Sequence, residues 1–177
     1  MTALTVLLSA VLWAAALWRF GLTWDLPAYL FLASITVPLA VIDLRTLRLP
    51  NIVTLTAYPV VAVLLLLPAA IDARWSDYGR AALAGVALLA LYVVLHLVNP
   101  AGMGLGDVKL SGSLGALLGW ISWNALLWGA VAGFLLAAVA GLVLISLRRA
   151  GRKSELPFGP WMLAGAWLAT LGSPLLG

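Results

Sequence analysis

Two aspartates carry most of the chemical information in this chain of 177 residues, which contains only six acidic residues in all. Asp107 follows a glycine-rich segment that contains Gly102, Gly104 and Gly106, and Asp43 lies at the end of an apolar run. A carboxylate at membrane depth costs about 2.5–3.5 kcal/mol on insertion scales, so such residues are functional candidates by default. The two aspartates therefore suggest a paired-carboxylate site.

Paired carboxylates have a recognisable chemistry. Two of them close together do not both ionise cheaply, so the pair shares a proton. The ionised member activates a water molecule, while the protonated member donates to a substrate carbonyl. This is the chemistry of aspartic proteases, and it requires neither a metal nor a nucleophilic side chain. Because the titrations of such a pair are coupled, we assign no separate roles to Asp43 and Asp107.

The glycines before Asp107 allow two interpretations. Gly104 and Gly106 permit backbone angles closed to other residues and the close approach of a substrate backbone. In the simpler alternative they only turn the chain, and Asp107 is the N-cap of the next helix. A Walker loop and a dinucleotide fingerprint are excluded, since the segment has no Gly-Lys-Ser/Thr and no preceding strand.

Composition predicts an all-α, polytopic membrane bundle with a single domain over residues 1–177. Hydrophobic residues make up 64% of the chain, and the mean hydropathy is +1.12. The chain has no cysteine and one histidine, so we expect no disulfide, no metal site and no cofactor. The net charge of +4 is carried by short loops, which indicates contact with membrane lipid rather than with nucleic acid.

Seven apolar segments are expected to span the membrane, at roughly 3–20, 27–44, 52–70, 80–98, 107–122, 125–147 and 158–176. The fifth is short and rich in glycine, so it could begin as irregular backbone that lines a cavity. The first segment is expected to be a retained helix rather than a cleaved signal.

Loop charges predict the orientation. One side of the membrane receives seven basic residues, and the other receives three. The larger set is Arg45, Arg48, Lys109, Arg148, Arg149, Arg152 and Lys153, and the smaller set is Arg19, Arg74 and Arg80. The excess predicts a cytoplasmic N-terminus and places Asp43 and Asp107 at the cytoplasmic face. Asp25, Asp72 and Asp77 fall on the opposite side and cannot join the site.

Three segments together resemble the type IV prepilin peptidases, the bacterial branch of the GxGD aspartic proteases. They are the nine residues from Asp43 to Asn51, the nine from Gly102 to Leu110, and the Leu-Pro-Phe-Gly-Pro run of 156–160. Their order and spacing match the family, and the resemblance covers about residues 25 to 175.

The resemblance implies an activity and a set of site residues. Such enzymes remove the short basic leader of prepilins and pseudopilins at the cytoplasmic face of the bacterial plasma membrane, just before the hydrophobic helix. Asp43 and Asp107 correspond to the catalytic pair. The residues implied to contact the substrate or to shape the loops are Gly104, Gly106, Pro50, Asn51, Lys109, Phe158, Gly159 and Pro160.

The chain departs from the resembling family in one respect. Many members begin with a cytoplasmic domain that carries paired Cys-x-x-Cys motifs, associated with N-methylation of the new terminus. This sequence contains no cysteine, so it resembles a short form, and we expect no methyl transfer.

Other polar residues are expected to be structural. His96 is interpreted as a buried or interfacial histidine with a local partner. Lys109, two positions after Asp107, is expected to point away from the aspartates if the segment is helical. The pairs Gly115/Gly119 and Gly129/Gly133 are expected to allow close helix packing.

Two other classes of function remain open from the residues. A small transporter or channel would use Asp43 and Asp107 as proton or cation ligands. It would be expected to have acids at span centres and inverted repeats, whereas these acids lie near span ends and no repeat is visible. A non-catalytic assembly protein with a decayed peptidase fold is the third possibility, and the intact aspartates argue against it.

Overall fold

The computed structural model describes residues 2–100, 102–147 and 157–173. Over these residues the chain forms seven helices and no strand. They are α1 (Thr2–Phe20), α2 (Leu26–Thr46), α3 (Asn51–Ile71), α4 (Trp75–Val98), α5 (Leu105–Ile121), α6 (Trp123–Ser146) and α7 (Gly159–Gly172). The all-α prediction is confirmed. The basic residues at 148–153 lie outside the described residues.

Five of these helices are long and apolar enough to cross a membrane, namely α1 to α4 and α6. Helix α5 has 17 residues and α7 has 14, so each is shorter than the ~20 residues that a straight span needs. A polytopic membrane protein is therefore confirmed, while the number of seven spans stays a prediction.

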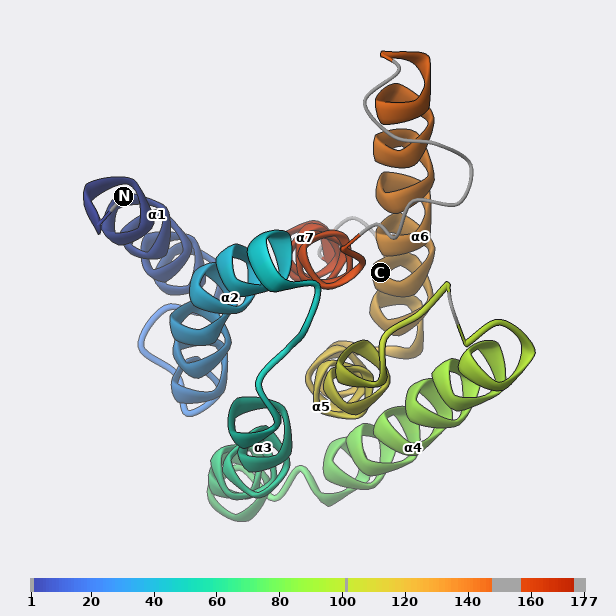
Figure 1. Ribbon diagram of the computed structural model, residues 1–177. Helices are drawn as coiled ribbons and strands as arrows, with labels where there is room; N and C mark the ends of the chain where they lie inside the picture. Colours follow the sequence, from blue (N-terminus) through green and yellow to red (C-terminus); the bar gives the residue numbers. More distant parts are fainter. Residues whose placement is uncertain (1, 101, 148–156, 174–177) are drawn as a thin grey trace.

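Helix α5 occupies the centre of the bundle, with α3, α4, α6 and α7 around it (Figure 1). Small residues allow this close packing. A Cβ on Gly115 would lie 2.8 Å from the backbone oxygen of Ala84 on α4, and a Cβ on Gly119 would come closer still to the side chain of Ala84. Gly133 packs in the same way on Trp161 and Met162 of α7, and Gly129 packs on Leu118 of α5 and Ala169 of α7. The predicted glycine contacts are confirmed, and they fix α5 against α4 and α6 against α7.

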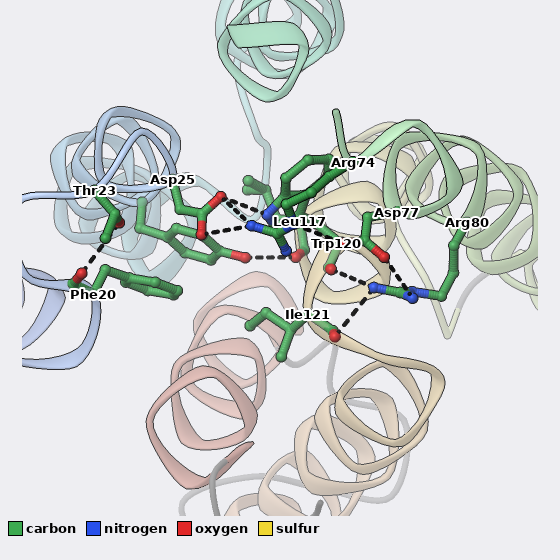
Figure 2. Close-up of polar contacts among 10 residues, drawn as sticks. Phe20, Thr23, Asp25, Arg74, Asp77, Arg80, Leu117, Trp120 and Ile121 are labelled. Carbon is green, nitrogen blue, oxygen red and sulfur yellow. Dashed lines mark hydrogen bonds and ion pairs between the residues drawn. The ribbon is translucent and has the colours of Figure 1, made fainter. Parts of the chain in front are cut away.

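Charged residues are paired at the end of the bundle where α2 begins and α5 ends (Figure 2). Arg74 forms ion pairs with Asp25 at 3.0 Å and with Asp77 at 2.7 Å. Burial lowers the pKa of Arg74, but the hydrogen bonds and charges of Asp77 and Asp25 raise it by more, so the guanidinium stays charged. The indole of Trp120 donates to Asp25 at 2.8 Å.

Arg80 closes the C-terminus of α5 at the same end. Its guanidinium donates to the backbone oxygens of Gly119, Trp120 and Ile121 at 2.7, 2.6 and 3.2 Å. A cation at this position also opposes the negative end of the helix dipole. This end of α5 is therefore anchored, and the opposite end carries Asp107. The prediction that Asp25 and Asp77 lie away from Asp43 and Asp107 is confirmed. Asp25 and Asp43 lie at opposite ends of α2, and Asp77, through Arg80, lies at the end of α5 opposite to Asp107.

Candidate active site

Asp43 lies on the last turn of α2, and only 3% of it is exposed. The helix ends three residues later, at Thr46, because Leu47 adopts a left-handed conformation with φ of 52° and its amide donates to the backbone oxygen of Asp43. Oδ2 of Asp43 accepts a hydrogen bond of 3.0 Å from the amide of Gly159, the first residue of α7. A carboxylate is favoured at this helix N-terminus, where amides are free and the dipole is positive.

Asp107 is the third residue of α5 and is 5% exposed. The N-cap of this helix is Gly104, not Asp107. The alternative in which Asp107 acts as the N-cap is therefore wrong. Oδ2 of Asp107 lies next to Gly104, 3.3 Å from the position of a Cβ on that residue, while Oδ1 has no hydrogen-bond partner among the described residues.

Gly159 marks the point where the two carboxylates meet. A Cβ added to Gly159 would lie 2.9 Å from Oδ2 of Asp43 and 3.3 Å from Oδ1 of Asp107. The two acid groups also interact electrostatically. The structure thus brings together two residues that are 64 positions apart in the sequence, and it does so from three helices: α2, α5 and α7.

A cavity of about 390 Å³ lies over the pair. Its walls come from the α2–α3 connection and from the start of α5. They comprise Asp43, Leu47, Arg48, Leu49, Asn51, Gly104, Leu105, Gly106, Asp107 and Lys109. Two carboxylates, the basic side chains Arg48 and Lys109, and several leucines therefore line one cavity.

The glycines before Asp107 work by close approach rather than by unusual backbone angles. Gly104 has a φ of −69°, and Gly21 is the one glycine with a positive φ among the described residues. The expectation of special angles at Gly102, Gly104 and Gly106 is wrong on this point. A Cβ on Gly106 would lie 2.8 Å from Cβ of Leu49, so a larger residue there would displace Leu49 or the start of α5.

Pro50 and Asn51 begin α3, with Pro50 at the N-cap. Oδ1 of Asn51 accepts a hydrogen bond of 2.9 Å from Nζ of Lys109. Lys109 therefore ties the start of α5 to the start of α3 across the cavity wall. Its ammonium is directed to Asn51, although Lys109 is also one of the residues that line the cavity over the aspartates.

The Pro-Phe-Gly-Pro segment positions α7. Phe158 is the N-cap residue and Pro160 is the second residue of the helix. Proline is well tolerated in the first turn of a helix. The ring of Phe158 packs on Phe134 of α6 and on Tyr92 of α4, with centroids 5.1 and 5.9 Å apart. These contacts hold the Gly159 amide against Asp43.

His96 has the local partner that the sequence suggested. Its Nδ1 lies 2.8 Å from the backbone oxygen of Met103. No group of three or more His, Cys, Asp or Glu side chains among the described residues is arranged to hold a metal.

Sequence reasoning missed three residues near the pair: Arg48 as a cavity wall, Leu49 as the neighbour of Gly106, and Tyr92. Arg48 and Leu49 lie inside the first motif and could have been proposed from it. Tyr92 lies in an apolar run without a motif, so no local signal marks it.

Comparison with known proteins decides the family. The model of the type IV leader peptidase family matches residues 30–146, a stretch that contains both aspartates. The chain belongs to this family. No solved structure matches it.

Several relatives of this leader peptidase family chain share one name. The prepilin leader peptidase/N-methyltransferase of Pseudomonas aeruginosa is 30% identical over 95% of this chain and 57% of the relative. The protein of that name from Aeromonas hydrophila is 34% identical over the same shares. The one from Bacillus subtilis is 32% identical over 93% of this chain and 63% of the relative. The chain thus spans little more than half the length of these relatives.

Proposed function

We propose that this chain is a membrane aspartic endopeptidase that removes the basic leader from prepilin-like or pseudopilin precursors. The observation that carries the proposal is the meeting of the Asp43 and Asp107 carboxylates beside the Gly159 amide. Membership of the leader peptidase family and the names of the relatives support the substrate class.

The reaction follows from two carboxyl groups that share one proton. The ionised carboxylate takes a proton from water as the water oxygen bonds to the scissile carbonyl carbon. The protonated carboxyl donates to the carbonyl oxygen, which gives a tetrahedral intermediate. When the C–N bond breaks, a carboxyl group returns a proton to the leaving amine. The Gly159 amide holds Asp43 in place through these steps.

The position of the pair suits a cut at the membrane surface. Asp43 lies in the last turn of α2, and Asp107 lies in the first turn of α5. A substrate whose hydrophobic helix lies in the membrane would present the residues just before that helix at this level. The positive-inside distribution supports the cytoplasmic face, with the N-terminus on the same side.

Lipid contact is proposed from the many exposed apolar side chains of α1, α3, α4 and α6, which include Val6, Val63, Val86 and Leu142. The alternative of a transporter is not favoured, because both carboxylates lie at helix ends and one is held by a helix N-terminus.

The test is a cleavage assay with the purified chain in lipid vesicles and a full-length prepilin. Mass spectrometry of the product identifies the new N-terminus. We expect one cut directly before the hydrophobic segment. Vesicles with a pH-sensitive dye measure proton flux in parallel, and flux without cleavage would contradict the proposal in favour of a transporter. The same mass spectra, with S-adenosylmethionine added, test the prediction that this polypeptide does not methylate its product.

A further inference from the structure

Two buried side-chain atoms in the described part of the chain have no hydrogen-bond partner: Oη of Tyr92 and Oδ1 of Asp107. Tyr92 is 0% exposed and Asp107 is 5% exposed. Buried polar atoms are nearly always paired in folded proteins, so each such atom calls for an explanation. That both belong to one region of the bundle suggests a shared explanation.

The packing fixes the Tyr92 ring next to the aspartate pair. The ring contacts Phe158, with centroids 5.9 Å apart, and Phe134, with centroids 5.5 Å apart. Phe158 directly precedes Gly159, whose amide holds Asp43. Tyr92 also lies close enough to Asp107 for the two to interact electrostatically. The tyrosine is therefore held through Phe158 near the aspartate pair, on the helix that packs most extensively on α5 (Figure 1).

The loop between α4 and α5 is anchored one turn further along. His96 lies four residues after Tyr92 and contacts the backbone oxygen of Met103, next to Gly104. This contact holds the start of α5 at a fixed height relative to α4. Tyr92, on α4, and Asp107, in the first turn of α5, are therefore carried by two helix segments that are fixed relative to each other.

If Tyr92 only filled space, its buried hydroxyl would lose its hydrogen bonds to water and gain none in the protein. Phenylalanine would pack the same ring against Phe134 and Phe158 without desolvating a polar atom. A hydroxyl is favourable at this place only if it meets an acceptor, and Oδ1 of Asp107 is the acceptor left without a partner.

We propose that Tyr92 is a positioning residue of the aspartate pair, whose hydroxyl donates a hydrogen bond to a water molecule that in turn donates to Oδ1 of Asp107. The hydrogen bond fixes the rotamer of Asp107 and favours its ionised form. This inference rests on the proposed peptidase function for its kinetic consequences, but the hydrogen bond itself is independent of that function.

Other charged or titratable groups around Asp107 are few. Asp43 faces it from α2, Arg48 from the α2–α3 connection, and Lys109 from α5 itself. His96 is on α4 and is engaged by Met103. The neighbouring described parts of α3, α6 and α7 present no charged side chain to the pair. A change in the pH profile that follows removal of the Tyr92 hydroxyl alone would therefore report on Asp107 and Asp43.

The test compares Tyr92→Phe with Tyr78→Phe. Both variants remove one hydroxyl from α4, and Tyr78 lies at the far end of that helix, where its hydroxyl donates to Ala62. For Tyr92→Phe we expect kcat to fall about tenfold to a hundredfold, as loss of a hydrogen bond to a charged group predicts. KM should stay within about twofold and the acid side of the kcat profile should move to higher pH. Tyr78→Phe should match wild type in all three.

A second measurement does not depend on cleavage. The ¹³C carboxyl signal of Asp107, assigned by its loss in Asp107→Asn, is titrated in wild type and in Tyr92→Phe. We expect its titration midpoint to differ between the two proteins. An unchanged midpoint overturns the inference, as does a Tyr92→Phe enzyme with unchanged kcat and pH profile. If wild type cleaves no prepilin, the proposed function fails and the titration still decides the role of Tyr92.

Discussion

At the scale of single residues, the site depends on the absence of side chains as much as on their presence. Gly159 donates its amide to Asp43 and leaves the space in which both carboxylates meet. Gly106 leaves room for Leu49, which brings the α2–α3 connection close to α5. Glycine at these positions is explained by contact and not by backbone angle.

Replacement of Gly159 by alanine should inactivate the enzyme without unfolding it. The new methyl would lie 2.9 Å from Asp43 and 3.3 Å from Asp107, so it pushes the two carboxylates apart. Misplacement of reacting groups by about 1 Å costs roughly a hundredfold in rate. Prepilin cleavage measures the effect. Gly172→Ala on the same helix is the control, since a Cβ there would meet nothing within 4 Å. Equal activity in both variants would contradict the assigned geometry.

Replacement of Gly106 by alanine should lower cleavage by roughly tenfold, because Leu49 must move and the cavity wall moves with it. Gly79→Ala is the matched control in open space on α4 and should be neutral or slightly stabilising. Gly115→Ala should instead lower the unfolding temperature, since its Cβ would clash with α4. A Gly106→Ala enzyme with wild-type kcat would show that this contact does not matter.

At the scale of helices, the sequence predicted the elements better than their ends. Runs of about 20 apolar residues predict helices because a helix satisfies its backbone hydrogen bonds within one segment in lipid. The fourth was expected to begin near residue 80, but α4 begins at Trp75. Its first turns carry Asp77 and Arg80, which pair with each other at 2.9 Å, so these charges are accommodated inside the helix.

The motifs predicted which carboxylates pair, but not how they are held. The Gly159 amide reaches Asp43 across 116 positions, and only the placement of α7 reveals it. The same is true of Tyr92, since its neighbours Phe134 and Phe158 come from other elements. In a uniformly apolar segment, a contact with a distant element leaves no local sequence pattern that would mark the residues involved.

Helix α5 should lose stability when its Arg80 anchor is removed. Arg80→Met breaks hydrogen bonds to three backbone oxygens and the ion pair with Asp77. We expect the free energy of unfolding to fall by about 2–3 kcal/mol, measured with denaturant in one detergent. Arg80→Lys should recover only part of it, because an ammonium cannot span the three acceptors. An Arg80→Met protein as stable as wild type would contradict the anchoring role.

At the scale of the whole molecule, the account requires the carboxylate end of the bundle to face the cytoplasm and the Asp25–Arg74 end to face outward. The chain has no cysteine, so single cysteines can be introduced without a background. Thr46 lies exposed near Asp43, and Ser76 lies exposed at the opposite end.

An impermeant maleimide should label the Ser76→Cys variant in intact cells and the Thr46→Cys variant only after the cells are broken. The reason is the excess of basic residues that the sequence predicts on the side of Asp43 and Asp107. Labelling in the reverse order would place the site on the outer face and would contradict cleavage from the cytoplasm.

The most direct test of the central claim is the cleavage of purified prepilin by Asp43→Asn and Asp107→Asn in lipid vesicles. Asparagine keeps the shape of each side chain but cannot share the proton, so we expect each variant to lose roughly a thousandfold or more in kcat. Unfolding temperatures measured on the same samples should stay close to that of wild type. Cleavage by either folded variant at a rate within tenfold of wild type would contradict the two-aspartate mechanism.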